Sequence, residues 1–256
     1  MRRKCLFGPI WSRRLGSSLG INLTPYKTCS LDCVYCECGI TTTLTVERQE
    51  YILPEEVIEH LETYRRSPRF REHPPSYITF AGFGEPTLNS GLRRIIRFLK
   101  ESFPEQRIAL ITNGTLFGLY PEIVGEIRGV NVLIPSLDAG TPEAFVTVNR
   151  PHPVLRFDQY LQGLITLRQH FQGAIWLEVF IVEGINDRVE EIELLQKHIE
   201  QIAPHRVHIN SVDRPPAENW VRSPALPKLQ KIAHALRGEV ITVPPQSQIF
   251  CPPRSV

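Results

Sequence analysis

Short apolar runs that alternate with helical patterns organise most of the chain. Residues 77–81 read Tyr-Ile-Thr-Phe-Ala, which predicts a buried strand ending at Gly82. Apolar residues then recur three and four positions apart from Leu92 to Leu99, the pattern of an amphipathic helix. Similar runs predict strands at 19–23, 108–111, 130–134, 175–182 and 206–209. Further helices are predicted from residue 54, from residue 186 or 187, and over 226–236.

This alternation of strand and helix predicts a parallel sheet with helices outside it. It gives about six strand–helix units, fewer than the eight of a complete barrel. We therefore expect an α/β fold, a partial TIM-type (β/α)6 barrel. The predicted organisation is an N-terminal arm over residues 1–18, the barrel over 19–238, and a C-terminal tail over 239–256 that packs on the barrel.

Composition agrees with one large domain and adds little about partners. The chain has 256 residues and a formal net charge of +2, which is too small a charge to indicate a nucleic-acid or membrane partner. Arginines do cluster near the start, at Arg2, Arg3, Arg13 and Arg14. Such an arm either contacts phosphate, for example of RNA, or forms a solvated surface.

The cysteines bear on function because of the compartment in which we expect the protein. No stretch reads as a signal peptide, and no apolar run approaches the roughly 18 residues of a membrane span. We therefore expect a cytoplasmic protein with no membrane partner, whose thiols stay reduced. Six cysteines in that setting favour metal binding or redox chemistry over disulfides.

Three of these cysteines form a C-x-x-x-C-x-x-C motif directly after the first predicted strand. Thiolates from Cys29, Cys33 and Cys36 can hold three corners of one iron–sulfur cubane and leave the fourth iron without a protein ligand. The alternative is a zinc knuckle with Cys38 as its fourth ligand. Structural zinc usually pairs two separated cysteine hooks, and no second hook follows in the sequence.

Residues 29–36, Cys-Ser-Leu-Asp-Cys-Val-Tyr-Cys, resemble the signature of the radical S-adenosylmethionine (SAM) superfamily, including the aromatic residue before the third cysteine. Flanking segments resemble a subfamily described as wyosine-base-synthesis-like iron–sulfur oxidoreductases. These segments lie at 7–9, 12–16, 18–20, 27–29, 84–87, 135–140 and 149–152. The resemblance extends over nearly the whole chain and is far more specific than the cysteine motif alone.

The resemblance implies a barrel of the radical SAM type and a defined chemistry. A [4Fe-4S] cluster on the three cysteines would bind SAM and cleave it reductively to methionine and a 5′-deoxyadenosyl radical. The radical would take hydrogen from an unidentified substrate: an RNA base, a peptide or a small molecule. An electron donor such as flavodoxin or ferredoxin would supply the electron.

Polar residues follow the predicted strands, where a parallel barrel binds its ligands. The resemblance implies that Gly84 and Glu85 bind the SAM ammonium, although Phe83 stands where the family has its first glycine. It implies that Arg150 binds the SAM carboxylate and that Tyr35 lies beside the adenine. The other residues expected to contact the cofactor are Thr112, Asn113, Ser136, Asp138, Glu178 and Asn186.

Several of these residues also have simpler interpretations. Thr-Asn-Gly and Gly-Glu-Pro are good turn sequences, Asn186 with Asp187 suits a helix cap, and Glu178 could be half of a buried ion pair. Their shared position at strand ends favours the cofactor site.

Other side chains and function classes stay open at this point. Cys5, Cys38 and Cys251 could hold an auxiliary cluster or donate hydrogen, but buried thiols without such a role are the simpler interpretation. His152 and His208 could reach the strand ends or be structural. The competing classes are a non-catalytic iron–sulfur electron carrier and a zinc-dependent binding module.

Overall fold

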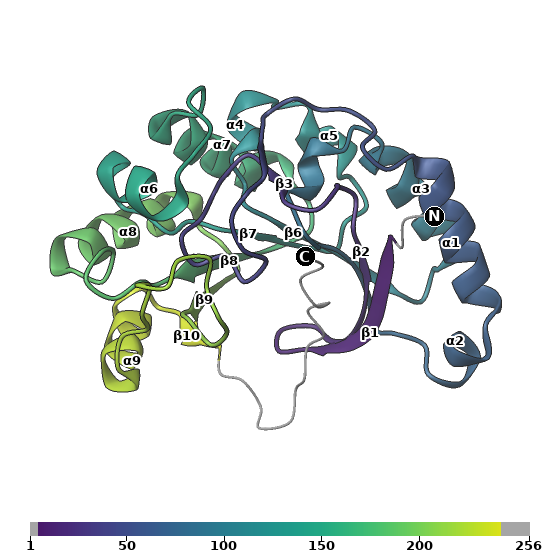
Figure 1. Ribbon diagram of the computed structural model, residues 1–256. Coiled ribbons are helices and arrows are strands. Elements are labelled where there is room, and N and C mark those ends of the chain that lie inside the picture. The colour runs from purple at the N-terminus through teal and green to yellow at the C-terminus, as the bar shows by residue number, and fades with distance from the viewer. Residues whose placement is uncertain (1–4, 242–256) are drawn as a thin grey trace.

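A computed structural model of the protein describes residues 5–241. One sheet of eight strands, in the order β1-β2-β5-β6-β7-β8-β9-β10, curves into an arc with helices on its outer side (Figure 1). Within the described residues, no pairing joins the edge strands β1 and β10. The predicted α/β fold with a mostly parallel sheet is confirmed, and its arc is open.

The parallel strands occur in chain order from β2 onwards, and each pairs with its neighbour in the order. They are β2 (Gly16–Ile21), β5 (Tyr77–Phe80), β6 (Arg107–Thr112), β7 (Val132–Pro135), β8 (Ala174–Phe180), β9 (Arg206–Asn210) and β10 (Glu239–Val240). All six strands expected from the apolar runs are therefore present.

The longer helices between these strands bury one apolar face each. In α3, Leu92, Ile95, Ile96 and Leu99 are the buried residues, as the spacing predicts. The helices are α1 (Pro54–Arg66), α2 (Pro68–Glu72), α3 (Leu92–Ser102), α4 (Leu116–Leu119), α5 (Ile123–Glu126), α6 (Pro142–Asn149), α7 (Phe157–His170), α8 (Val189–Ile202) and α9 (Leu226–Ala235), with a 3-10 turn η1 (Pro86–Leu88). In the described part of the chain, none of these helices is long and apolar enough to cross a membrane.

Strand alternation separates two layers of apolar packing. Leu133 of β7 belongs to the large core beneath the helices. Its neighbours Val132 and Ile134 face the other way and pack with Leu15 and Tyr77 in a smaller cluster. The concave side of the arc is therefore filled by side chains from the strands and from the β1–β2 turn.

The N-terminal segment departs from the prediction. Leu6–Ser12 forms β1, which pairs antiparallel with β2, and β2 begins three residues before residue 19, at Gly16. The predicted arm thus contributes a strand to the sheet. A Cβ on Gly20 would lie 2.1 Å from the Phe7 ring, so glycine allows the two strands to pack. The predicted tail after Ile241, with Cys251, lies outside the described residues.

Candidate functional site

The three cysteines lie in one loop that is closed by a short strand pair. β3 (Thr28–Cys29) runs parallel to β4 (Thr43–Leu44) in a separate two-stranded sheet. The Lys27 carbonyl accepts hydrogen bonds from the amides of Thr42 and Thr43, each at 3.1 Å. The Thr45 amide donates to the Cys29 carbonyl at 2.9 Å. The backbone around the first cysteine is therefore fixed.

The loop after β5 packs directly on this cysteine loop. The Lys27 amide donates to the Phe83 carbonyl and the Glu85 amide donates to the Thr28 carbonyl, both at 3.1 Å. A Cβ on Gly84 would lie 1.9 Å from the Thr28 oxygen. Only glycine allows the two backbones to approach this closely, which explains the residue the motif requires here.

The end of α6 holds the other side of the cysteine loop. The Val34 amide donates to the Val148 carbonyl at 2.9 Å, and the Asp32 amide donates to the Asn149 carbonyl at 3.0 Å. Arg150 caps this helix in the left-handed conformation, with φ 44°. The cysteine loop is thus anchored to the loop after β5 and to the end of α6.

Each cysteine sulfur faces an N–H donor from a different part of the chain. Asn113 Nδ2 lies 3.6 Å from Cys29 Sγ, and Asn149 Nδ2 lies 3.4 Å from Cys33 Sγ. The Lys27 ammonium donates to Cys36 Sγ at 3.1 Å. Soft thiolates with N–H donors around them are the ligand environment of iron–sulfur clusters. These residues therefore fit a [4Fe-4S] cluster with three protein ligands.

The three thiols differ in how readily they ionise. A hydrogen bond from Cys38, followed by the nearby Lys27 ammonium, lowers the pKa of Cys36 to about 5 despite its burial. Burial raises the pKa of Cys29 to about 12 and that of Cys33 well above its ordinary value. Without metal, Cys36 is thus the thiolate of the trio at neutral pH.

The cysteine arrangement does not resemble a site for one ion. Among residues 5–241, no group of three or more His, Cys, Asp or Glu side chains is gathered to hold a single metal ion. A cubane spreads its cysteine ligands over three separate corners, whereas structural zinc draws four ligands around one centre.

Glu85 is the centre of a buried network beside the cysteine loop. Its Oε1 accepts from the hydroxyls of Thr87 and Thr112, both at 2.6 Å, and from the Thr87 amide at 2.9 Å. Its Oε2 accepts one bond, from the Asn113 amide at 2.7 Å. Burial raises the pKa of this carboxyl group, and the four hydrogen bonds oppose the shift. The network brings together Gly84, Glu85, Thr112 and Asn113, four of the residues predicted from the sequence.

Asp138 organises a second buried network on the far side of the cysteines. Its Oδ2 accepts from the Tyr35 hydroxyl at 2.6 Å and from Asn149 Nδ2 at 2.8 Å, while Oδ1 accepts from the Phe180 amide at 2.8 Å. The Tyr35 ring stacks on Phe180 with centroids 3.8 Å apart. Asn186 Nδ2 donates to the carbonyls of Asp138 and Phe180, each at 2.7 Å.

This network corrects one of the simpler interpretations of the sequence. Asn186 does not cap α8, because the N-cap residue is Arg188 and the Asn186 amide instead joins the ends of β7 and β8. Asp187 accepts from the Gly184 amide at 2.9 Å and pairs with Lys228 at 2.5 Å.

Two other predicted residues have charged partners in the structure. Arg150 forms ion pairs with Glu218 at 2.5 Å and Asp32 at 3.8 Å. Glu178 forms an ion pair with Arg14, so the structure contains the ion pair that was the alternative for this residue. Ser136 forms hydrogen bonds through its backbone. Its carbonyl accepts from the Tyr160 hydroxyl, and its amide donates to the Thr112 carbonyl at 3.2 Å.

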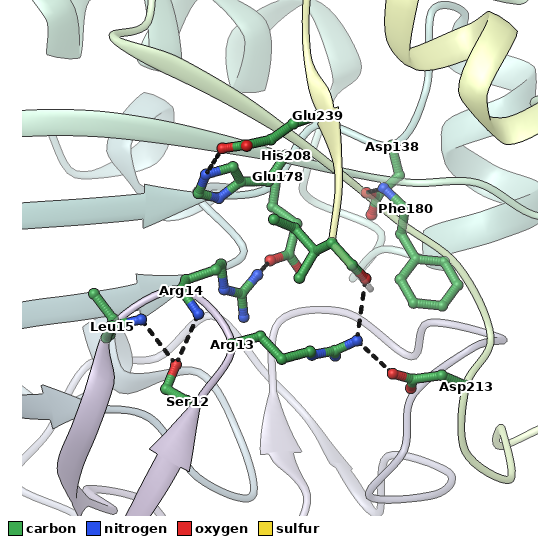
Figure 2. Close-up of polar contacts among 11 residues, drawn as sticks. Ser12, Arg13, Arg14, Leu15, Asp138, Glu178, Phe180, His208, Asp213 and Glu239 are labelled. Carbon is green, nitrogen blue, oxygen red and sulfur yellow. Dashed lines mark hydrogen bonds and ion pairs between the residues drawn. The ribbon is translucent and has the colours of Figure 1, made fainter. Parts of the chain in front are cut away.

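The β1–β2 turn reaches across the open side of the arc, as Figure 2 shows. Arg13 pairs with Asp213, and its Nη1 lies 3.4 Å from the Ile241 carbonyl. Burial lowers the pKa of Arg14 to about 10, which leaves it a cation beside Glu178. The two arginines, predicted as a phosphate-binding or solvated arm, thus join the first strands to the last ones.

Histidines and the remaining described cysteines lie apart from the cluster loop or at its edge. His208 Nε2 is 3.4 Å from Glu239, and burial with Arg14 nearby lowers its pKa to about 4. Cys5 Sγ is 2.8 Å from His60 Nδ1 in the core. Cys38 adjoins the loop through its bond to Cys36. His152 donates its backbone amide to Ser30, at 2.9 Å.

Sequence reasoning did not assign a role to Lys27 or to the Asn149 side chain. Both reach a cysteine sulfur. The sequence signal that could have identified them is their position, since Lys27 stands two residues before Cys29 and Asn149 directly before Arg150.

A cavity of about 530 Å³ lies away from this site, between α5 and the end of α7. Phe117, Val124 and Phe171 contribute apolar walls, and Arg128 and His170 contribute polar ones. None of the predicted cofactor residues lines it, so the cavity has no connection to the cysteine chemistry.

Fold and site together define an α/β protein whose strand ends hold a loop with three cysteine thiols. A family model described as the radical SAM superfamily matches residues 23–195. The chain belongs to this superfamily, whose members are enzymes that generally use a [4Fe-4S] cluster and SAM. The resemblance predicted from the motifs is confirmed.

Two curated relatives that align with most of this chain carry different names. The GTPase Obg of Brachyspira hyodysenteriae is 37% identical over 84% of this chain, which spans only 31% of that protein. A UPF0026 protein of Methanocaldococcus jannaschii is 33% identical over 92% of this chain and 71% of its own length.

Solved structures share the fold. A radical SAM methyltransferase from Sphaerobacter thermophilus superposes with a TM-score of 0.66 at 19% identity, over 87% of this chain and 66% of that one. TYW1 with a lysine-pyruvate adduct bound gives a TM-score of 0.61 at 16% identity, over 87% of this chain and 74% of that one.

Proposed function

We propose that this chain is a radical SAM enzyme in which Cys29, Cys33 and Cys36 hold a [4Fe-4S] cluster with one open iron. The observation that carries the proposal is that each of these three sulfurs faces its own N–H donor, in one anchored loop at the strand ends. When bound, cluster and SAM supply reductive cleavage to methionine and a 5′-deoxyadenosyl radical, which takes hydrogen from an RNA base, a peptide or a small molecule.

The protein's own residues would hold SAM in place. Among the described residues, Glu85 Oε2 accepts from one donor, the Asn113 amide, so we assign it to the methionyl ammonium, a charge-assisted pairing. Tyr35 has one ring face on Phe180, and we assign the other to the adenine. Arg150 would bind the SAM carboxylate in exchange for one of its acidic partners.

The remaining predicted residues fall into two groups. We assign Thr112, Asn113, Ser136 and Asp138 to the walls around the methionyl and ribose parts of SAM. Glu178 and Asn186 are occupied by Arg14 and by backbone carbonyls, so we assign them to supporting that wall. An electron donor such as flavodoxin or ferredoxin would act in the same reducing compartment, the cytoplasm.

The test is reductive cleavage of SAM by anaerobically reconstituted protein. With dithionite and SAM, the protein should release 5′-deoxyadenosine, whereas Cys29→Ala should release none. Cys5→Ala is the matched control, because it removes a thiol that lies in the core beside His60, away from the cluster loop, and should keep the activity. A reconstituted, reduced protein that makes no deoxyadenosine contradicts the proposal, and a non-catalytic electron carrier would behave in this way.

The substrate follows from the same reaction. Deuterium placed on candidate substrates should move into 5′-deoxyadenosine when the correct C–H bond is present. Transfer from an RNA base, a peptide or a small molecule would select among the three classes.

A further inference from the structure

Lys27 is a buried cation inside the cysteine loop. Its exposed fraction is 2%, and an ammonium group removed from water to this extent is costly unless an anion or strong acceptor lies beside it. Among residues 5–241, no carboxylate forms an ion pair with Lys27. Its charge must therefore be balanced by other groups.

The cysteine sulfurs are those groups. Lys27 Nζ donates to Cys36 Sγ at 3.1 Å, and Cys29 and Cys33, once ionised by a bound cluster, would add their charges to that balance. The ammonium is therefore placed beside the sulfurs that we assign to the cluster.

The backbone holds the lysine in this place at a cost. Lys27 has φ 50°, in the left-handed region, where a non-glycine residue is strained. Its amide is bonded to Phe83 and its carbonyl to Thr42 and Thr43. A lysine kept at a strained position with its side chain turned inward indicates a role for that side chain.

We propose that Lys27 is the resident counter-ion of the cluster and raises its reduction potential through the positive charge that it places 3.1 Å from Cys36 Sγ. The inference rests on the proposed function, since it presumes a cluster on the three cysteines. Reduction adds one negative charge to an already anionic assembly of thiolates and cluster, so a fixed cation nearby favours the reduced form. Removing that cation makes the cluster harder to reduce.

The experiment compares three substitutions in the full chain after anaerobic reconstitution. Lys27→Met removes charge and donor, Lys27→Gln keeps a donor without charge, and Lys27→Arg keeps the charge. Lys100→Met, at an exposed position of α3, controls for loss of a lysine elsewhere. Iron and sulfide per chain are measured first, and the midpoint potential is then measured without SAM by redox titration followed by EPR.

We expect the midpoint potential to become more negative in Lys27→Met and Lys27→Gln, and to stay near wild type in Lys27→Arg and Lys100→Met. Loss of iron in the two neutral variants with retention in Lys27→Arg also supports the counter-ion, because assembly then needs the charge. An unchanged potential in the neutral variants, or loss of iron in all three Lys27 variants, overturns it. Wild-type protein that assembles no [4Fe-4S] cluster contradicts the proposed function instead, so the two failures are distinct.

Discussion

Cys36 is set apart from its two neighbours by the hydrogen bonds that reach its sulfur. Cys38 and Lys27 lower its pKa to about 5, while burial raises the pKa of Cys29 to about 12. Since the thiolate is the species that binds metal and attacks electrophiles, Cys36 is the residue through which we expect iron to enter the loop.

The same contrast predicts the alkylation pattern of protein without metal. At pH 7, iodoacetamide should modify Cys36 at least about a hundredfold faster than Cys29 or Cys33, because their thiolate fractions differ by more than that. Below pH 5 the Cys36 rate should fall about tenfold per pH unit. Peptide mass spectrometry over time measures both, and Cys38→Ala should move the pH profile upward. Equal labelling of the three cysteines would refute the assignment.

Gly84 supports the site because it has no side chain, which lets two backbone segments approach closely. In Gly84→Ala, a Cβ 1.9 Å from the Thr28 carbonyl must push two backbones apart, at a cost of about 1–3 kcal/mol. We expect a lower urea midpoint and less iron bound per chain after reconstitution.

Gly125→Ala is the matched control, since a Cβ there meets nothing within 4 Å and the residue lies in α5. Alanine in a helix should be neutral or stabilising by about 0.5–1 kcal/mol. Equal iron content in the two variants would show that the close approach at Gly84 is not needed for the site.

At the scale of elements, most of the sheet was readable because buried parallel strands are continuous apolar runs. Residues 108–111 and 206–209 became β6 and β9 with ends shifted by one residue. β1 was missed because Gly8 and Pro9 interrupt its pattern and four of its seven residues are not strong strand formers. Its place in the sheet depends on pairing with β2, which no local pattern reveals.

The sequence predicted which residues form the site, but not which other residues they contact. The strand-end positions of Glu85, Thr112 and Asp138 followed from the order of elements. That Glu178 pairs with Arg14, and that Lys27 turns toward the sulfurs, depends on segments far apart in the chain. Tertiary contacts of this kind leave no periodic signal in the sequence.

The Arg14–Glu178 pair joins the β1–β2 turn to β8 and is largely buried, with side-chain exposures of 13% and 17%. Glu178→Gln leaves the guanidinium without its anion, so the free energy of unfolding should fall by about 3 kcal/mol. The double variant Arg14→Met with Glu178→Met should recover part of the loss.

Urea unfolding at pH 7 measures each variant. Asp158→Asn, which breaks an exposed pair with Arg156, is the matched control and should leave the unfolding midpoint unchanged. A Glu178→Gln midpoint equal to that of Asp158→Asn would mean that the turn is not held by this ion pair.

At the scale of the whole molecule, the residues assigned to the cofactor gather at one edge of the sheet. The carboxyl ends of the parallel strands carry the cysteine loop and the Glu85 and Asp138 networks. The β1–β2 turn, which precedes β2 at Gly16, sends Arg13 to Asp213 beyond the carboxyl end of β9 and Arg14 to Glu178 in β8. We expect cofactor and substrate to bind at the carboxyl ends, as ligands of parallel barrels do.

Hydrogen exchange can test directly where SAM binds. A ligand slows exchange where its contacts suppress local opening, by a factor of up to about 100 when it is present at 100 times its Kd. Adding SAM to reconstituted protein should slow exchange in peptides that contain 82–86, 112–115 and 136–140. Peptides over 94–100, in α3 on the outer side of the sheet, should exchange at the same rate with and without SAM. Slowing at 94–100 without slowing at the three strand-end loops would place SAM away from the cysteine loop.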